Sequence, residues 1–174
     1  MQKRADPNEA LLRKYPEQVV LVTTRGTDGK ANVMAVGWVA IASSVPPMFV
    51  LGIDEDAYTY KLLTETREFV VAFPSERMAR ETLFAGSHSG RDKDKFAEAG
   101  IRTEPAALVK APLVADAVAN FECALVEVTK PGDCPLVVGR VLAAHANADA
   151  SLGRLYSTGK APELGGVRVV DIGA

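Results

Sequence analysis

Apolar residues in the first third of the chain follow the alternation and β-branching that are typical of strands. The segment Gln18–Thr24 is rich in β-branched residues, which pack well on a pleated sheet, and it predicts a first strand. The Asp-Gly pair at Asp28 and Gly29 tolerates the positive φ angles of a tight hairpin turn. The chain is therefore expected to return as a second strand over Asn32–Ala42, with a third strand at 48–53.

The rest of the chain alternates short helices with longer strands. Residues at helical spacing predict two short helices at Tyr58–Arg67, with Asp56 as its N-cap, and at Glu76–Ala85. A third, charged short helix that ends on a glycine is predicted at Arg91–Gly100. The glycine-rich and serine-rich stretch 86–90 is predicted to be a loop. Further strands are predicted at Glu68–Phe73, Ala119–Thr129, Pro135–Ala146 and near Val167–Ile172, the second and third of these forming a long hairpin.

This order of elements predicts a mainly β protein with short inserted helices. The first three strands are joined by turns too short for parallel crossovers, so the sheet is mostly antiparallel. A Greek-key or split β-barrel is the expected architecture, because closure protects the edges of a sheet. The length of 174 residues fits a single domain over 1–174, with residues 1–14 as an N-terminal extension.

Composition narrows the class of protein further. Apolar residues make up 48% of the chain and charged residues 24%, as in ordinary globular proteins. A net charge of −2 without a basic cluster argues against nucleic acid as a partner. The N-terminus lacks the apolar stretch of a secretory signal, so we expect a cytoplasmic protein whose two cysteines, Cys123 and Cys134, are thiols.

One uncharged segment, 31–53, has the length of a membrane-spanning helix. The adjacent Pro46 and Pro47 would break such a helix, and Ser43 and Ser44 beside them are typical of a turn. We therefore expect two buried strands around a loop, and no membrane partner.

The usual catalytic and metal-binding motifs are absent from the sequence. There is no G-x-S-x-G elbow, P-loop, H-E-x-x-H or G-x-G-x-x-G motif, and the two histidines, His88 and His145, are far from each other and from the cysteines. No metal site is therefore expected. Any chemistry is expected to belong to a bound cofactor that the protein positions.

The segment 15–53, YPEQVVLVTTRGTDGKANVMAVGWVAIASSVPPMFVLGI, resembles the opening of the flavin reductase-like family, in particular its flavoredoxin branch. The residues that match the family's pattern there are Pro16, Thr23, Thr24, Asp28, Gly29, Lys30, Asn32, Trp38, Ser43, Pro46 and Pro47. Further matches continue at 59–61, 64–71, 89–90, 94–96, 122–123, 132–133 and 138–141, so that the resemblance covers almost the whole chain. Each motif alone has low specificity, and their shared order carries the resemblance.

The resemblance implies an FMN-binding split barrel in which a homodimer helps to enclose the flavin. For the phosphate it points to Thr59 at the start of a short helix, where backbone amides and the helix dipole favour an anion, with Lys61, Ser89, Gly90, Arg91 and Lys95. For the flavin ring it points to Asn32, Val33, Met34, Ala35 and Val36 and to Ser43, Ser44 and Val45. Taken singly, the phosphate residues also fit helix capping and solvated charge. Trp38 is assigned no role, because a tryptophan within such a strand is more often part of a core.

Three residues depart from the family's pattern. Leu62 stands where a phosphate-site Asn is frequent, Cys134 where many nicotinamide-dependent members carry His, and Arg140 where a Glu is frequent. A thiol cannot hydrogen-bond as an imidazole does, so use of a nicotinamide donor is less secure than flavin binding.

The resemblance implies an oxidoreductase that passes electrons from NADH or NADPH through FMN to a flavin or a redox protein. The alternatives are a non-catalytic flavin-binding or electron-transfer protein and a structural barrel without flavin. With no Rossmann motif present, the sequence leaves the choice between NADH and NADPH open.

Overall fold

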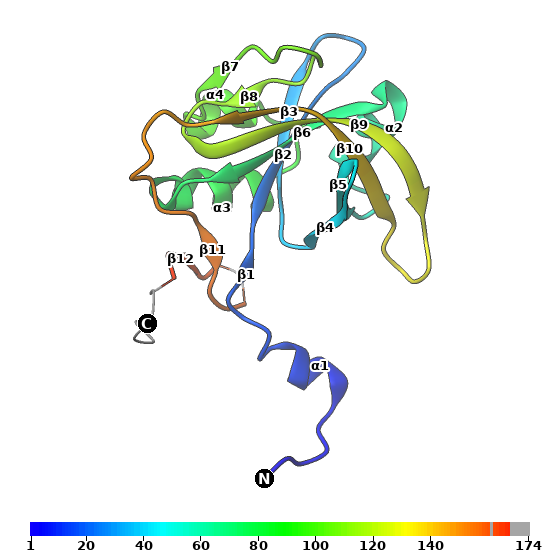
Figure 1. Ribbon diagram of the computed structural model, residues 1–174, viewed down its shortest axis with the longest axis vertical. Helices are drawn as coiled ribbons and strands as arrows, with labels where there is room; N and C mark the ends of the chain where they lie inside the picture. Colours follow the sequence, from blue (N-terminus) through cyan, green and yellow to red (C-terminus); the bar gives the residue numbers. More distant parts are fainter. Residues whose placement is uncertain (161, 168–174) are drawn as a thin grey trace.

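The computed structural model describes residues 1–160 and 162–167 (Figure 1). Its main element is a seven-stranded antiparallel sheet with the order β3-β2-β6-β9-β10-β5-β4. The bounds of these strands are β2 Val20–Arg25, β3 Ala31–Val36, β4 Val39–Ser44, β5 Pro47–Gly52, β6 Glu68–Pro74, β9 Ala117–Thr129 and β10 Leu136–Ala146. The sheet curls into a split β-barrel, and the long β9–β10 hairpin joins its two halves.

Alternating residues of these strands fill the barrel with apolar side chains. Phe69 is fully buried in this core, and the same cluster holds a group of three phenylalanine rings in tilted and edge-to-face contact, namely Phe49, Phe73 and Phe121. A Cβ at Gly139 would overlap the Phe69 ring, so β10 needs a glycine where it crosses that ring.

Short helices cover the barrel from outside. Helix α2, Tyr58–Thr66, packs against β2, β3 and β6. The 3-10 turn Glu76–Met78 leads into α3, Ala79–Ser87, which lies on β3 beside α4, Lys95–Ala99. A second apolar cluster, which includes Leu21, Val33 and Ala85, fills the space between these helices and the sheet.

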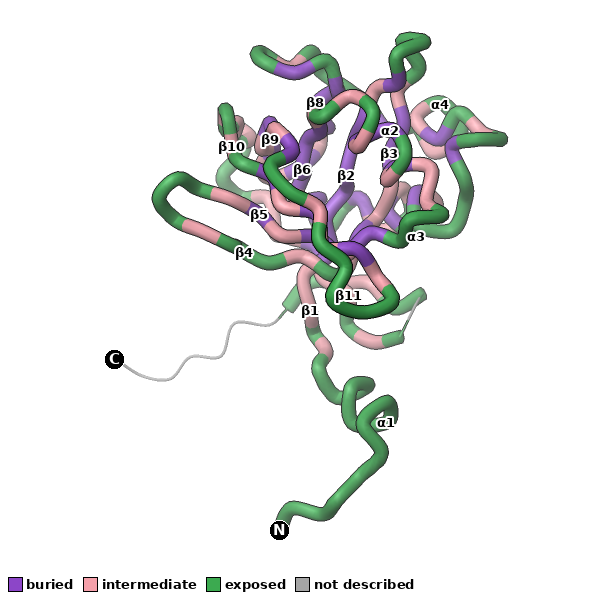
Figure 2. The backbone as a smooth tube through the Cα atoms, turned by 90° about the vertical axis from the view of Figure 1, so that its right-hand side faces the viewer, coloured by how far each residue is buried: buried purple, intermediate pink, exposed green. Residues whose placement is uncertain are grey.

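The N-terminal segment lies apart from the barrel (Figure 2). Helix α1, Pro7–Leu11, buries none of its residues and projects from the body. Three short strands, β1 Glu17–Gln18, β11 Tyr156–Ser157 and β12 Leu164–Gly165, form a small sheet. A two-stranded sheet of β7 Thr103–Glu104 and β8 Leu113–Val114 lies beside the barrel, and sequence pattern predicted none of these short pairings.

The structure confirms the main strands and corrects four local predictions. The second predicted strand is broken at Gly37 and Trp38, because its halves β3 and β4 lie at opposite edges of the split sheet. Trp38 is 58% exposed, so placing it in a core was wrong. The N-cap of α2 is Ala57, not Asp56. The helix predicted from Arg91 begins only at Lys95, after the N-cap Asp94.

The structure also bears on a predicted C-terminal strand, the two cysteines and the predicted absence of a membrane-spanning helix. The strand predicted near 167–172 lies, apart from Val167, outside the described residues. Cys123 and Cys134 are free thiols, as expected. None of the helices in the described residues is both long and apolar enough to cross a bilayer.

Candidate functional site

A pocket of about 260 Å³ opens at the outer edge of β3, where three segments meet. They are β3 itself, the N-terminal end of α2, and the end of α3 with the turn that leads to α4. Its lining is Asn32, Met34, Asp56, Ala57, Tyr58, Thr59, Ala85, Gly86, Ser87, His88, Ser89, Gly90, Arg91 and Lys95. We call this the β3–α2 pocket. It brings together seven predicted cofactor residues, which are Asn32, Met34, Thr59, Ser89, Gly90, Arg91 and Lys95.

The floor of the β3–α2 pocket is a buried polar pair. The side-chain amide of Asn32 donates to Oγ1 of Thr59 at 2.9 Å and to Oγ1 of Thr24 at 3.4 Å. Asn32 and Thr59 are 3% and 2% exposed. The Oδ1 atom of Asn32 is buried and has no hydrogen-bond partner within the described structure. A buried acceptor without a hydrogen bond lowers the stability of the fold, so this atom is suited to accept a hydrogen bond from a ligand.

Gly90 closes the pocket over Asn32. A Cβ built at Gly90 would overlap the Asn32 side-chain amide and would lie 3.2 Å from the Tyr58 ring. Outside the pocket, Nζ of Lys30 donates to the Gly90 carbonyl at 3.3 Å. The approach of backbone to side chain is therefore so close that only glycine fits, which is typical of loops that surround a ligand.

The first turn of α2 presents backbone donors to the same space. Its N-cap, Ala57, has no side-chain hydrogen bond to the helix, and Thr59 lies in the first turn. The first amides of a helix have no intrahelical acceptor, and the helix dipole places partial positive charge there. The end of α2 that faces the β3–α2 pocket is therefore suited to an anion.

Arg91 spans the pocket from the turn after α3 to the start of α2. Its Nη1 donates to the carbonyl of Asp56 at 3.0 Å, and the guanidinium lies over the Tyr58 ring at 5.5 Å from the centroid. Its own amide donates to Oγ of Ser89 at 3.2 Å. The side chain is exposed, yet no carboxylate pairs with it in the described residues. The guanidinium therefore keeps donors available at the pocket mouth.

Lys95 contributes a second and buried cation. It is only 4% exposed, and its Nζ donates to the carbonyls of Ala85 and His88, each at 3.0 Å. Burial lowers the pKa of Lys95 to about 8. The cause is desolvation of the charged form, which no carboxylate in the described chain relieves by an ion pair.

The other predicted cofactor residues lie outside the pocket lining. Lys61 is on an exposed face of α2, with Nζ 3.8 Å from Oε1 of Glu65, because two residues along a helix rotate the side chain by about 200° from Thr59. Val33, Ala35 and Val36 pack in the two apolar clusters, so only their backbones are candidates for contact. Ser43 and Ser44 are the last two residues of β4, and Val45 lies in the turn that follows it.

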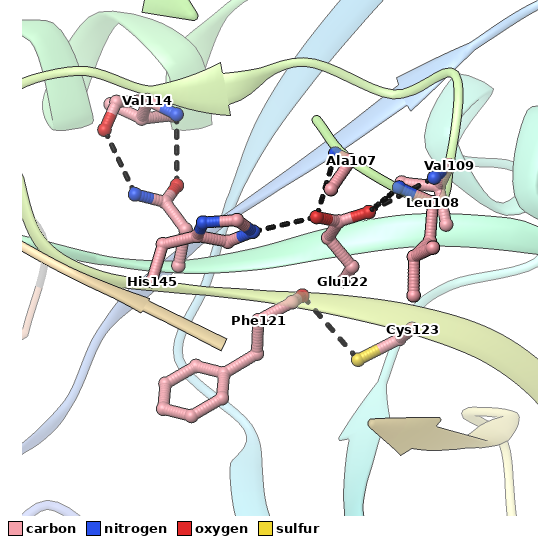
Figure 3. A network of polar contacts seen from close by, with 9 residues as sticks. Ala107, Leu108, Val109, Val114, Phe121, Glu122, Cys123 and His145 are labelled. Carbon is pink, nitrogen blue, oxygen red and sulfur yellow. Dashed lines mark hydrogen bonds and ion pairs between the residues drawn. The ribbon is translucent and has the colours of Figure 1, made fainter. Parts of the chain in front are cut away.

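Sequence pattern missed two features, one in this pocket and one elsewhere in the fold. Asp56 and His88 line the pocket from positions next to helix ends, and Tyr58 lines it from the first residue of α2; none of the three was predicted as a cofactor residue. Far along the chain, the fully buried carboxylate of Glu122 accepts hydrogen bonds from three consecutive backbone amides, those of residues 107–109, and contacts His145 (Figure 3). Only the fold brings β9, β10 and this loop together, so no local motif marks the pair.

Comparison with known proteins identifies the class that this fold and pocket define. The flavin reductase like domain family matches residues 12–165, and the chain belongs to that family of flavin-binding proteins. Its fold is that of FMN-binding flavin reductase-like proteins.

Two solved structures and one relative in sequence show which members of the family the chain is similar to. The chain is similar to flavoredoxin of Desulfovibrio vulgaris (Miyazaki F), with a TM-score of 0.84 and 26% identity over 100% of this chain and 97% of that one. It is similar to an FMN-binding protein from Thermus thermophilus with bound p-hydroxybenzaldehyde, with a TM-score of 0.85 and 26% identity over 100% and 99% of the two chains. A flavin reductase (NADH) of Kitasatospora aureofaciens is 29% identical over 77% of this chain and 68% of the relative.

Proposed function

We propose that the protein binds FMN, with the phosphate and the adjoining ribityl chain in the β3–α2 pocket. The single observation that carries this proposal is the mixed polarity of the pocket. Arg91 and Lys95, two cations that no carboxylate of the described residues pairs with, lie in the same lining as Oδ1 of Asn32, a buried acceptor without a partner in that part of the chain. A phosphate needs donors and positive charge, whereas an unpaired acceptor needs a hydroxyl. FMN carries both groups side by side.

The roles of the lining residues follow from this pairing. Arg91, the first-turn amides of α2 and the hydroxyl groups of Thr59 and Ser89 would donate to phosphate oxygens. Oδ1 of Asn32 would accept from a ribityl hydroxyl. The outer edge of β3, which has β2 on one side only, would offer backbone groups to the polar edge of the flavin ring.

The activity that fits the family is that of an oxidoreductase of the flavin reductase type, with NADH or NADPH as donor and a flavin or a redox protein as acceptor. When bound, FMN supplies the hydride-accepting chemistry, and the protein positions it and its reaction partner. The relative named as an NADH flavin reductase supports this proposal.

A non-catalytic flavin-binding or electron-transfer protein is the second candidate, and Cys134 favours it. Burial raises the pKa of this thiol, Asp54 and Asp133 raise it further, and Lys130 opposes them. A neutral thiol lacks the hydrogen-bonding capacity of the histidine frequent at this position in the family.

We further propose a homodimer in which β4 meets a second copy. Strand β4 is an edge of the seven-stranded sheet, and its neighbourhood exposes Trp38, Ile41 and Val45 by 58%, 75% and 90%. Exposed apolar side chains along an unpaired strand edge are costly in a monomer.

The test of function is the visible spectrum of the purified protein, followed by anaerobic addition of NADH or NADPH. A flavin spectrum that bleaches with either donor is expected for the oxidoreductase. A flavin spectrum that neither donor bleaches would leave the electron-transfer alternative, and a colourless protein that FMN titration does not alter would contradict both.

A further inference from the structure

Residues 1–14, which we call the N-terminal arm, contain a helix that packs on nothing in its own chain. Helix α1 has five residues, and none of them is buried (Figure 2). Asp6 caps it by accepting hydrogen bonds from the backbone amides of Asn8 and Glu9 at 2.9 and 3.3 Å. A helix this short is not stable in water by capping alone, because helices in proteins take most of their stability from packing an apolar face. The arm therefore needs a surface to pack against.

Two adjacent leucines at the end of α1 point in different directions. Leu11 and Leu12 are 56% and 53% exposed. Successive residues are rotated by about 100° around a helix, so one surface cannot cover both side chains. Leu11 lines a groove against its own chain, whereas Leu12 is not part of that lining. Leu12 is therefore available to a second surface.

The groove beside Leu11, which we call the Trp38 groove, is open and has a volume of about 780 Å³. Its lining includes Trp38 and Val39 at the start of β4 and Tyr156 of β11. A Cβ built at Gly52 would lie 2.8 Å from Cε3 of Trp38, so the exposed ring is seated on the backbone of β5. A tryptophan that is fixed and still exposed beside apolar side chains is typical of a protein contact site.

Charge distinguishes the N-terminal arm from the rest of the chain. Of the 20 Lys and Arg and the 22 Asp and Glu side chains in the sequence, residues 1–14 hold four and two. The arm is therefore net positive and the remainder net negative, so the arm of one copy is attracted to the body of another. Helix α1 also precedes the region that the family shares, residues 12–165, so its role is specific to this chain.

We propose that two copies of the chain exchange their N-terminal arms, so that α1 and Leu12 of each copy dock in the Trp38 groove of the other. This inference rests on the homodimer in the proposed function and extends its contact beyond β4, since the groove lies at the start of that strand. In a two-fold dimer the exchange is reciprocal, so each contact is made twice. Gly37, which directly follows β3, also lines the groove, so a docked arm lies next to the strand proposed to meet the flavin ring.

Trp38 is the only tryptophan in the sequence, so its fluorescence reports on the groove directly. The experiment measures acrylamide quenching of Trp38 in the flavin-free full-length protein over a dilution series, with the molar mass at each concentration from analytical ultracentrifugation. We expect the dimer to protect Trp38 from acrylamide. Dilution should remove this protection in parallel with the dimer, because docking between copies follows mass action.

Leu12→Asp separates the arm from the contact at β4. The new carboxylate is at a position that is exposed in the single chain, so it affects only a docked arm. We expect the concentration at which half of the protein is dimeric to rise at least about tenfold, because a charge buried in an apolar contact is unfavourable. Leu108→Asp makes the same change at another exposed leucine and should leave that concentration unchanged. Urea denaturation checks that both variants fold.

Three results would overturn the arm exchange. Protection of Trp38 that does not change on dilution would show that the groove is covered within one chain. A Leu12→Asp variant that forms the dimer and protects Trp38 as the wild type does would show an interface without the arm. A wild type that is monomeric at every concentration would remove the homodimer as well, whereas FMN titration of the same samples tests the flavin site separately. If Leu12→Asp does not fold, Leu12→Ser, which removes the apolar side chain without adding charge, takes its place with the same expected direction.

Discussion

Nε2 of His145 on β10 lies 2.6 Å from Oε1 of Glu122 on β9, a fully buried carboxylate that contacts the loop of residues 107–109. The carboxylate oxygens of Glu122 also accept hydrogen bonds from the backbone amides of Ala107, Leu108 and Val109 at 2.6–2.9 Å. Burial alone would raise the pKa of Glu122, but these amides and His145 together outweigh it and lower the pKa. The ionised carboxylate thus fastens the loop to the barrel.

Glu122→Gln is expected to destabilise the fold by about 1–3 kcal/mol, because the new amide group faces buried donors that it cannot satisfy. Since the folded-state pKa is lowered, the contribution is complete above the unfolded-state value of about 4.3 and is lost as the pH falls through the folded-state pKa. Urea denaturation from pH 3 to pH 7 measures both effects. Glu98→Gln, in an exposed pair with Lys93, should change stability by less than about 1 kcal/mol. Equal effects of the two substitutions would contradict the role of Glu122.

The parts of the fold that sequence predicts are those set by local pattern. Runs of β-branched and apolar residues identify β2 and β6, which are buried on both faces, whereas alternation identifies β9 and β10, whose side chains point in turn to the core and away from it. The break at Gly37 and Trp38 has no such signal, since it depends on where the barrel splits and not on the local residues.

In the candidate site, too, local motifs predict some residues and the three-dimensional fold determines the others. Thr59 and Gly90 are found through motif and helix start, and both line the β3–α2 pocket. Lys61 belongs to the same motif yet points away, because helix rotation separates it from Thr59. The Glu122–His145 pair joins residues of two strands, and no sequence spacing encodes it.

Gly90→Ala tests the close approach over Asn32. The added Cβ would overlap the Asn32 amide, so either the loop or Asn32 must move from the position that surrounds the ligand. We expect FMN affinity to fall at least about tenfold, equivalent to about 1.4 kcal/mol, in a fluorescence titration. Gly132→Ala is the matched control, because a Cβ at that position meets no atom within 4 Å among the described residues other than its chain neighbours. Similar losses in both variants would indicate a general effect of glycine replacement and would rule out the contact with Asn32.

Arg91→Ala separates a phosphate ligand from a surface cation. A charged hydrogen bond to phosphate contributes roughly 1.5–3 kcal/mol, so FMN affinity should fall about tenfold or more while riboflavin affinity and apoprotein stability stay nearly unchanged. Lys61→Ala removes a cation of the same motif that is paired with Glu65 outside the pocket, and it should leave FMN affinity within about twofold. Unchanged FMN affinity in Arg91→Ala, or equal losses in both variants, would remove Arg91 from the phosphate site.

Ile41→Asp tests whether β4 is the dimer contact. Ile41 is 75% exposed on an edge strand of the seven-stranded sheet, so a carboxylate there costs the monomer little. In a symmetric interface the same patch meets itself, and two copies of the new charge would be brought together and desolvated. Light scattering should give about twice 18.5 kDa for the wild type and about 18.5 kDa for Ile41→Asp. Leu108→Asp, at another apolar site with 62% exposure, should remain dimeric. A wild-type monomer that still binds FMN would show that one chain builds the site alone, and a dimeric Ile41→Asp variant would place the interface elsewhere.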